Sequence, residues 1–403
     1  MTTMTDPPEG TFRLSMLIND TRYRSYTFQF IALIVLIASL AFLMSNLFAN
    51  LAAAGLNISY GFLGEPAGYD VQQTLIEYTS QSTHLRAAWV GIINTLLVAF
   101  LACVTATILG VIAGVLRLSN NWLVSKLMSA YVEAFRNVPV LIWILVINTV
   151  VISMPAPRAY RGETPDAEMF LGLIAYTNRG IYIPAPTWGA GSGLVVLVFL
   201  ASLAAIWFLR RYAVKQLFDH GREIKTLWPS VGIFFVPTLL VYFIMGSPIG
   251  VDIPELKGFN FQGGTQIGRP LIALWLALSI YTGAFIAENV RAGIQAVSKG
   301  QTEAASSLGL RPGRVMNLVV LPQALRVIIP PLISQFLNIT KNSSLAIAVG
   351  YADVTATLGG ITLNQTGRAI ECILLLMAFY LTISLLISAV MNVYNRSVSL
   401  KER

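Results

Sequence analysis

Charge is scarce in this chain. Only 11% of its 403 residues are charged, whereas 55% are hydrophobic, and the mean hydropathy is +0.68. A soluble chain of this length would need far more charge to cover its surface, and several apolar runs reach the roughly 20 residues that cross a bilayer. The composition therefore excludes an ordinary soluble protein and indicates an all-α polytopic membrane protein. A transmembrane β-barrel is not expected, because the apolar runs are continuous rather than alternating.

Residues that bind metals or form disulfides are also few. The two cysteines, Cys103 and Cys372, lie within apolar runs, where packing explains them better than a disulfide or a metal pair. The two histidines, His84 and His220, lie in predicted loops far apart in the sequence. We therefore expect no metal site on this chain.

Two further classes of function lack their sequence signals. No Gly-x-x-x-x-Gly-Lys-Ser/Thr phosphate loop occurs, so ATP binding and hydrolysis by this chain are not expected. The net charge is +8, but no basic tract is interleaved with aromatic residues, so nucleic-acid binding is not expected either. We predict that the chain is not an enzyme and carries no cofactor of its own.

The apolar runs predict eight transmembrane helices. The predicted spans are Tyr26–Phe48, Ala88–Leu116, Val132–Met154, Ser192–Leu209, Ser230–Met245, Pro270–Ala292, Val327–Val349 and Ala369–Val393. Placing the N-terminus in the cytoplasm puts about two thirds of the 27 Lys and Arg residues in cytoplasmic segments, as the positive-inside rule requires. We therefore expect a multi-pass protein with both termini in the cytoplasm.

Three predicted outer segments are long and rich in proline, glycine and aromatic residues: Ala49–Ala87, Pro155–Gly191 and Gly246–Arg269. Acidic residues also gather on this side of the predicted topology. They are Glu65, Asp70, Glu77, Glu163, Asp166, Glu168, Asp252 and Glu255. These segments form either a solvated outer face or a docking surface for an extracytoplasmic partner.

A polar, basic segment lies between the sixth and seventh predicted spans and reads EAASSLGLRPGRVMNLVVLP from residue 303 to residue 322. Lys299–Leu308 contains good helix formers, and Glu303 lies in an early turn, where the helix dipole favours a carboxylate. Ala304 and Ala305 are small enough for another surface to approach closely, and Leu308 is available for an apolar contact. This part of the segment predicts a short helix.

A second helix is predicted to follow at an angle. Gly309 is suited to the left-handed conformation that ends a helix, and Pro312 is tolerated in the first turn of the next one. Val319, Leu321 and Leu325 fall on roughly one side of the second helix, which Pro322 should bend or end. From spacing alone, the pair is either an ordinary amphipathic interfacial loop or an element that binds a groove on another protein.

The segment resembles the EAA loop of ABC importer permeases: Glu-Ala-Ala, three residues, Gly, nine residues, an aliphatic residue, one residue, Leu-Pro. The matching residues are Glu303, Ala304, Ala305, Gly309, Leu321 and Pro322. Val319 stands where isoleucine is commonest, which is a mild departure. In that family the loop is the coupling helix that docks into the cytoplasmic ATPase subunit. The resemblance implies that these six residues couple the chain to an ATPase.

Further motifs are similar to those of polar amino-acid permeases. They are NTLLVAF (94–100), EAFRNVPVLIWI (133–144), YTGAFIAENVRAGIQAVSKGQTEAASSLG (281–309) and NITKNSSLA (338–346). The resemblance implies a five-helix core made of the second, third, sixth, seventh and eighth spans, with the other three as additions. The layout is similar to one subunit of the general L-amino-acid permeases, which pairs with a second, different permease subunit.

The resemblance also implies a setting and an organisation. The setting is the bacterial inner membrane, with a periplasmic amino-acid-binding protein and with ABC ATPase subunits that hold ATP and Mg²⁺. Residues 1–87 would precede a permease domain at 88–403, which contains an insertion at 155–269 and the coupling loop at 293–325.

Charged residues inside apolar spans are costly and are therefore candidates for a path that carries a zwitterionic amino acid. The candidates are Arg136 and Asn137 at the start of the third span, Glu288 in the sixth, and Lys341, Asn342, Ser343 and Ser344 in the outer part of the seventh. The alternative role for Arg136 is a positive-inside anchor. The alternative role for Glu288 is an internal ion pair, with Lys341 as one candidate partner. Pro139 should free a carbonyl group within the third span.

Gly110 and Gly114 form a GxxxG pattern in the second span, which predicts close helix packing and a contact that a partner permease could use.

Two other functions compete with that of an importer subunit. A stand-alone secondary transporter or channel should show repeated halves, and no clear repeat is visible. A membrane scaffold without transport is the other alternative. The EAA pattern favours the importer subunit over both.

Overall fold

The computed structural model describes residue 18 and residues 21–55, 57–162 and 165–398, in which seven helices are long and apolar enough to cross a membrane. A bent helix pair raises the possible spans to eight. The predicted all-α polytopic fold is therefore confirmed, and each predicted span coincides with one of these helices or with the bent pair. Glu163, which was predicted to lie on the outer side, is outside the described residues.

The chain divides into two units, at residues 1–61 and 62–403. The first unit contains helix α2 (Thr21–Ala53), whose 33 residues measure about 50 Å. No charged residue follows Arg24 in this helix. The helix is therefore long enough to span a bilayer by itself and matches the first predicted span.

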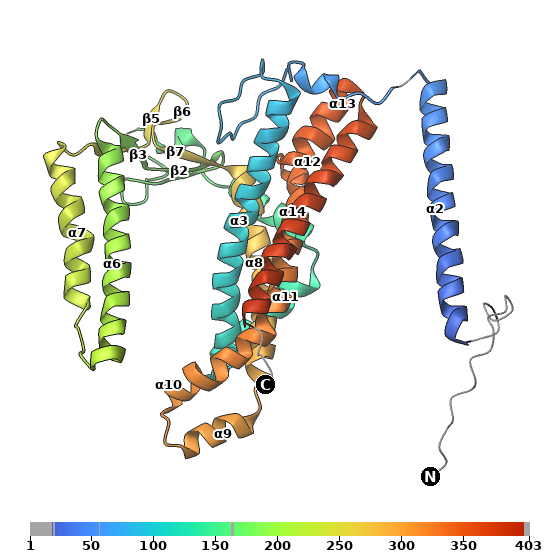
Figure 1. Ribbon diagram of the computed structural model, residues 1–403. Helices are drawn as coiled ribbons and strands as arrows, with labels where there is room; N and C mark the ends of the chain where they lie inside the picture. The colour runs from blue at the N-terminus through green and yellow to red at the C-terminus, as the bar shows by residue number, and fades with distance from the viewer. Residues whose placement is uncertain (1–17, 19–20, 56, 163–164, 399–403) are drawn as a thin grey trace, which may run out of the picture. The chain divides into compact units, whose positions relative to one another are not determined.

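Helix α8 (Arg269–Gln295) is the centre of the second unit. It packs against α3 (His84–Leu116), α4 (Trp122–Asn137), α5 (Val140–Ile152) and α11 (Leu321–Asn342). Helix α14 (Ala369–Val398) packs on α11 (Figure 1). The elements in contact are those of the five spans that the family resemblance assigns to the core.

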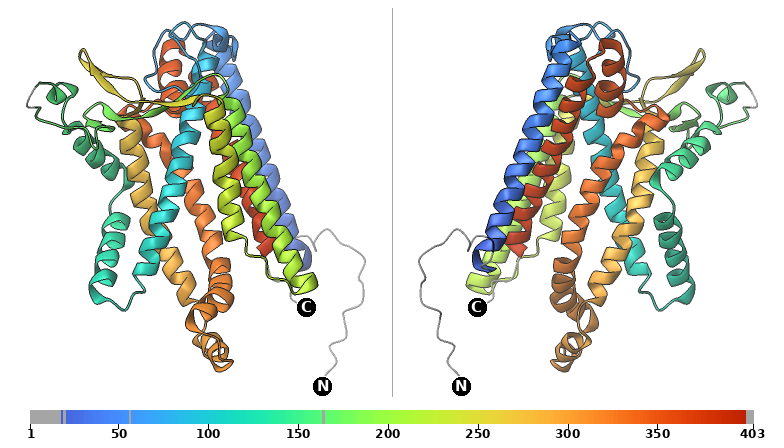
Figure 2. Two further views of the ribbon diagram at one scale, coloured as in Figure 1. Left: turned by 90° about the vertical axis from the view of Figure 1, so that its left-hand side faces the viewer. Right: turned by 90° about the vertical axis from the view of Figure 1, so that its right-hand side faces the viewer.

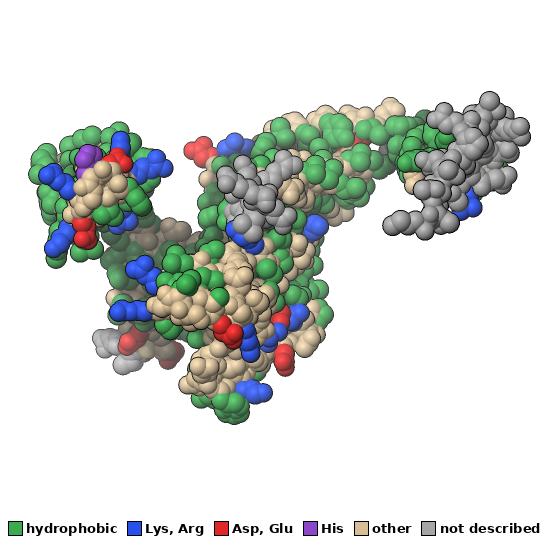
Figure 3. Space-filling view, turned by 60° about the horizontal axis from the view of Figure 1, so that its bottom comes forward, with side chains coloured by type: hydrophobic (Ala, Val, Ile, Leu, Met, Phe, Trp, Pro, Cys, Tyr) green, Lys and Arg blue, Asp and Glu red, His purple; other side chains and the backbone are tan. Residues whose placement is uncertain are grey.

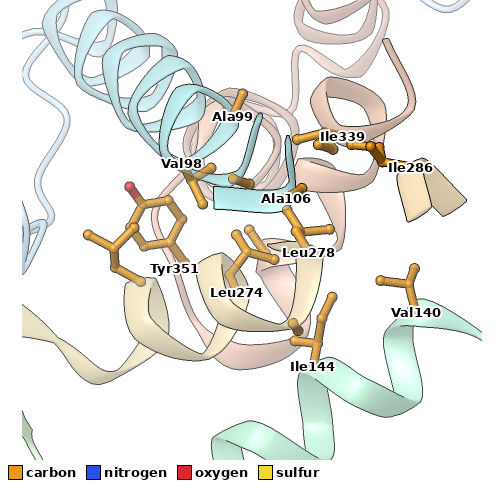
Figure 4. Packing of buried hydrophobic residues seen from close by; sticks show 14 of the residues in the cluster. Val98, Ala99, Ala106, Val140, Ile144, Leu274, Leu278, Ile286, Ile339 and Tyr351 are labelled. Atoms are coloured by element: carbon orange, nitrogen blue, oxygen red, sulfur yellow. The ribbon is translucent and has the colours of Figure 1, made fainter. Parts of the chain in front are cut away.

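The largest apolar cluster lies where α3, α5, α8 and α11 meet (Figure 4). Leu274, Leu278 and Ile286 of α8 are fully buried there, as is Ile144 of α5. The α3 residues facing them are small, which allows close approach. A Cβ at Gly110 would lie 2.5 Å from the Cβ of Ile286. The GxxxG pattern therefore packs α3 against α8 within this chain, and the predicted use by a partner permease is wrong because α8 occupies that face.

The third predicted span is broken. Helices α4 and α5 meet at an angle of 108° across Val138 and Pro139. Val138 has extended backbone, as steric conflict with a following proline requires, and Pro139 has no N–H to continue the ladder. The prediction of a continuous helix over Val132–Met154 with one freed carbonyl is therefore wrong.

Two of the predicted outer segments contain strands, which the sequence did not predict. One sheet has the order β1-β2-β7, from Ala175–Thr177, Gly180–Ile183 and Thr265–Gly268. Strand β3 (Ala185–Trp188) pairs with β4 (Ile249–Asp252), and β5 (Glu255–Lys257) pairs with β6 (Asn260–Gln262). All pairs are antiparallel, with Tyr182 opposite Gln266 and Leu256 opposite Phe261. Together with the short helix η2 (Pro157–Tyr160), they form what we call the strand module, residues 155–162, 165–189 and 248–268.

The chain between β3 and β4 forms a helical hairpin. Helices α6 (Ser192–His220) and α7 (Leu227–Ile244) pack against each other and correspond to the fourth and fifth predicted spans. Strand β7 leads directly into α8. The strand module is therefore connected to the central helix without an intervening loop.

The remaining elements are short. Helix η1 (Gly61–Gly64) precedes α3, and α9 (Lys299–Ser307), α10 (Pro312–Val315) and the π-helical turn η3 (Met316–Val320) join α8 to α11. Between α11 and α14 lie η4 (Ser343–Val349), α12 (Val354–Ala356), the π-helical turn η5 (Thr357–Thr362) and α13 (Leu363–Thr366). The loop with α9 and α10 lies at one end of the helices, and the strand module lies near the other (Figure 2).

Candidate functional site

The loop between α8 and α11 has the predicted helix–glycine–helix geometry. Helix α9 ends at Ser307, and Gly309 follows with φ +76°, in the left-handed region that favours glycine. Pro312 is the first residue of α10. The short helix, the glycine stop and the proline start are therefore confirmed.

Small residues of the EAA motif serve different purposes. Ala305 is buried against Val315 and Val320, so it allows α9 to approach the second half of the loop. Ala304 is exposed. The expectation that both alanines let another surface approach stays a prediction for Ala304, whereas Ala305 is covered by its own loop.

The free surface of the loop combines charges with exposed apolar side chains, of which Leu308 is the most exposed. Leu308 is 82% exposed at the corner between the two helices. Glu303, Arg311 and Arg314 are exposed around it. The space-filling view from this end shows acidic and basic side chains next to one another (Figure 3). A projecting apolar corner with charges around it is suited to insertion into a groove on another protein.

Pro322 does not end the second helix. It lies in the first turn of α11, where a missing N–H is tolerated, and the π-helical turn η3 comes directly before it. Leu321 and Leu325 are exposed, whereas Val319 is half-buried in the loop. The coupling loop is therefore connected to α11 by continuous helical backbone.

Three arginines surround one carboxylate near the end of α8 that leads into the loop. We call Arg117, Arg136, Arg291 and Glu288 the arginine cluster. Arg117 donates to Glu288 Oε2, and Arg291 donates to Oε1 from Nη2 at 2.6 Å and from Nε at 3.2 Å. Arg136 Nη1 lies 3.8 Å from Oε2, with its guanidinium 5.2 Å from the centre of the Phe285 ring. The cluster joins α3, α4 and α8 and carries two positive charges in excess.

This geometry decides between the alternative roles of Glu288 and identifies its partners. Glu288 is an ion-pair partner, and its partners are Arg117, Arg291 and Arg136. No ion pair joins Lys341 to Glu288 or to any other carboxylate among the residues described, so the candidate Lys341–Glu288 pair is wrong. Arg117 and Arg291 were not predicted. Their basic side chains near the ends of predicted spans looked like ordinary positive-inside residues.

The other predicted polar group, Lys341 to Ser344, lies at the end of α11 farther from the coupling loop. Lys341 is exposed, and Asn342 is the last residue of the helix. Ser343 is fully buried and donates to Thr340 O at 2.7 Å, whereas Ser344 donates to Lys341 O at 2.7 Å. Asn137 is exposed at the end of α4. The structure thus brings Arg136 and Glu288 together, and it places Lys341 and its neighbours elsewhere.

A buried polar network was missed as a site. Asn94 of α3 has no exposed surface, and its Nδ2 donates to Gln73 O at 3.0 Å and Ala352 O at 2.9 Å. Tyr351 donates to Asn94 O, and the amide of Val354 donates to Thr95 Oγ1, each at 3.0 Å. These bonds tie the start of α3 to the segment after η4. An asparagine inside an apolar run was the available signal.

Asp353 belongs to the same network. It caps α12 by accepting from the amide of Ala356 at 2.8 Å, and it has no exposed surface. Burial raises the pKa of its carboxyl from 3.8 to about 6, and the hydrogen bond from Ala356 opposes that shift. A Cβ at Gly91 would lie 2.1 Å from the hydroxyl of Thr357 and 2.8 Å from Asp353 O. Only glycine at position 91 allows α3 to approach this segment so closely.

A bundle built on one central helix, with a two-helix loop of EAA pattern continuing from that helix, is the arrangement that the resemblance to ABC importer permeases predicts for a transport subunit. Comparison with known proteins makes this class specific. The family model for the binding-protein-dependent transport system inner membrane component matches residues 227–400.

The chain also has full-length relatives. It is 51% identical over all of both chains to the glutamate/glutamine/aspartate/asparagine transport system permease protein BztB of Rhodobacter capsulatus. It is 43% identical, over 99% of this chain and 98% of the other, to the general L-amino acid transport system permease protein AapQ of Rhizobium johnstonii. It is 42% identical, over 98% and 99%, to the putative amino-acid ABC transporter permease protein YhdX of Escherichia coli.

The chain therefore belongs to the family of amino-acid ABC transporter permeases. It is a multi-pass inner-membrane transporter subunit and not an enzyme. Membership decides against the alternatives of a stand-alone secondary transporter and of a scaffold. It also implies partners of two kinds, an ATPase and a substrate-binding protein.

Proposed function

We propose that this chain forms the translocation path for polar L-amino acids together with a second, different permease subunit. A periplasmic binding protein delivers the substrate. ATP and Mg²⁺ are held by separate ATPase subunits, and this chain carries no cofactor. In this proposal, both termini lie in the cytoplasm. The substrates named for the two relatives from Rhodobacter and Rhizobium support a broad range that includes acidic amino acids and their amides.

One observation supports the coupling role above the others. The loop presents two exposed side chains, Glu303 on α9 and Leu308 at the corner, and its two ends continue into α8 and α11. Helix α8 carries Glu288 and Arg291 of the arginine cluster, and α11 continues from the loop without a break in the helical backbone at Pro322. A force applied to the loop would therefore reach two helices of the core. In this proposal, Glu303, Ala304, Gly309, Leu321 and Pro322 form or shape the contact, and Ala305 holds its two halves together.

The polar residues of the spans support the substrate class. A free amino acid carries an α-carboxylate, whatever its side chain. Lys341 is a fixed cation near the end of α11 farther from the loop, and the arginine cluster supplies excess positive charge near the other end of the spans. We propose that Lys341, with Asn342 and Ser344, reads the α-carboxylate on entry. Arg136 and Asn137, with Glu288 fixing Arg136, act at the inner end.

Ser343 has a different part in this proposal. Its hydroxyl is buried and donates to a backbone carbonyl, so it shapes the turn into η4 and does not bind the substrate. This departs from the prediction that all four residues of the Lys341 group line the path.

The experiment is purification of the tagged chain from membranes, followed by ATP-driven uptake in proteoliposomes. We expect an ATPase and a second permease to co-isolate, and glutamate and glutamine to be taken up only with ATP and a binding protein. Glu303→Lys should lose the ATPase. Glu223→Lys is the matched control, because Glu223 is exposed in the turn between α6 and α7. Retention of the ATPase and of uptake by Glu303→Lys would contradict the coupling role.

A further inference from the structure

The strand module ends in an aromatic side chain that nothing in the described part of this chain covers. Strands β5 and β6 are joined by a two-residue turn, Gly258–Phe259, in which Gly258 has φ +67°. Phe259 is 86% exposed. The next aromatic residue, Phe261, is 4% exposed and packs against Tyr160 and Tyr182. The module therefore buries one phenylalanine as its own core and presents the other to its surroundings.

The exposed turn is held in place by hydrogen bonds from outside the hairpin. Arg161 donates to Gly258 O, and Arg179 donates to Phe259 O at 3.5 Å. Tyr182 donates to Asn260 Oδ1 at 2.8 Å. Three side chains thus fix the backbone on which Phe259 is mounted. A preorganised aromatic side chain loses little conformational entropy on binding, which is typical of an interface anchor.

The surroundings of Phe259 argue against insertion into a bilayer. Glu255 and Lys257, on the strand before the turn, form an exposed ion pair at 3.1 Å. Asn260 and Gln262 follow on the other strand. An apolar centre with a polar rim of charges and amides is the composition of a protein–protein contact. Insertion into lipid would remove these charges from water, which is strongly unfavourable.

The position of the strand module indicates which partner protein can reach Phe259. Strand β7 ends at Gly268, and α8 begins at Arg269 and measures about 40 Å over its 27 residues before it leads into the coupling loop. The module and the loop are therefore at opposite ends of one helix. Since the proposed function assigns the loop to the ATPase in the cytoplasm, the module faces the side from which the substrate-binding protein arrives.

We infer that the Gly258–Phe259 turn is a docking anchor for the substrate-binding protein, with Phe259 inserted into an apolar recess on that protein. Arg161 and Arg179 are positioning residues that hold the turn. Because the module continues into α8, binding at this turn acts on the same helix that leads to the coupling loop. This inference rests on the proposed function, since it takes the binding protein as a partner.

The test uses the complete transporter in lipid nanodiscs and measures ATPase activity against the concentration of amino-acid-loaded binding protein. Phe259→Ser should raise the concentration for half-maximal stimulation about tenfold, which corresponds to about 1.4 kcal/mol. Arg179→Gln should also raise the concentration for half-maximal stimulation, but by a smaller factor. The control is Phe218→Ser, in which a similarly exposed phenylalanine (82%) on α6 is changed, and it should leave the curve unchanged.

A photo-crosslinking amino acid at position 259 identifies the occupant directly. Adducts with the binding protein support the inference. Adducts with the second permease or with lipid overturn it, as does an unshifted curve for Phe259→Ser when the wild-type complex is stimulated. If the wild-type complex itself shows no stimulation by any binding protein, the proposed function fails, which is a different outcome. Normal amounts of Phe259→Ser chain and partners in the membrane exclude a folding defect.

Discussion

Replacing Glu288 by glutamine tests whether the arginine cluster holds α3, α4 and α8 together. In the part of the chain that the structure describes, Glu288 is the only carboxylate within 4.0 Å of Arg117, Arg136 or Arg291. The amide of glutamine can still accept one hydrogen bond, but it leaves three guanidinium groups with no counter-charge. The side chains of Arg117 and Glu288 are 11% and 24% exposed, so water screens them only in part.

The expected loss of stability follows from the partial burial of Arg117 and Glu288. Removing one partner of a buried ion pair costs about 3–5 kcal/mol, and partial exposure reduces this to about 2–4 kcal/mol for Glu288→Gln. Arg136→Gln should cost less than about 1 kcal/mol, because its side chain is 40% exposed and its nitrogen lies 3.8 Å from the carboxylate. The double variant Arg117→Gln/Glu288→Gln should be no worse than Glu288→Gln alone, because one of the repelling charges is also removed.

The measurement is thermal unfolding of the purified complex in nanodiscs, with ATP-driven uptake by the same variants in proteoliposomes. The three variants should rank by stability, with Arg136→Gln close to the wild-type protein and the other two clearly below it. Equal losses of stability for Glu288→Gln and Arg136→Gln would refute the role of Glu288 as the carboxylate that holds the arginine cluster together. A double variant clearly less stable than Glu288→Gln alone would refute it as well, since it would show that removing one of the repelling charges brings no relief.

Four other predictions concern separate parts of the chain. Gly309→Val should abolish ATP-driven uptake while the chain remains in the membrane. The φ of +76° costs a β-branched residue at least about 1 kcal/mol, so the substitution should change the angle between α9 and α10; normal uptake would contradict this. Gly91→Ala should lower the thermal unfolding temperature by several degrees through its clash with the segment after η4, whereas Gly232→Ala, where a Cβ meets nothing within 4 Å, should not; equal melting would disprove the close approach. Lys341→Ala should reduce uptake of acidic and neutral amino acids alike with the ATPase still bound, and Lys341→Arg should be milder; loss of one substrate class alone would exclude α-carboxylate reading. Asp353 has a folded-state pKa raised to about 6, so its contribution to stability is present below about pH 4 and is lost as the pH rises through 6. Asp353→Asn should therefore flatten the dependence of the unfolding temperature on pH between these values, and an unchanged dependence would show that the carboxyl is not buried.

Much of the architecture could be predicted because its causes are local. A run of about 20 apolar residues forms a helix in a bilayer, where backbone groups have no other hydrogen-bonding partner. This reasoning located every span from the sequence. The turn at Gly309 and the helix start at Pro312 were predictable for the same reason, since each depends on the conformational range of one residue. The break at Val138 and Pro139 had a local signal too, but apolar length was given more weight than the proline.

The contacts between distant residues were decided only by the tertiary structure. Arg117 and Glu288 are 171 residues apart, and Asn94 and Ala352 are 258 apart, so no spacing rule relates them. Whether Ala305 faces its own loop or a partner depends on the angle between α9 and α10. The strands of the module are too short for a clear alternating pattern, and β2 pairs with β7 across the whole α6–α7 hairpin. Sequence by itself thus determined the helices, the coupling loop and the family resemblance. Helix packing decided which polar residues meet, because the energy of a buried charge depends on the partners that other helices bring to it.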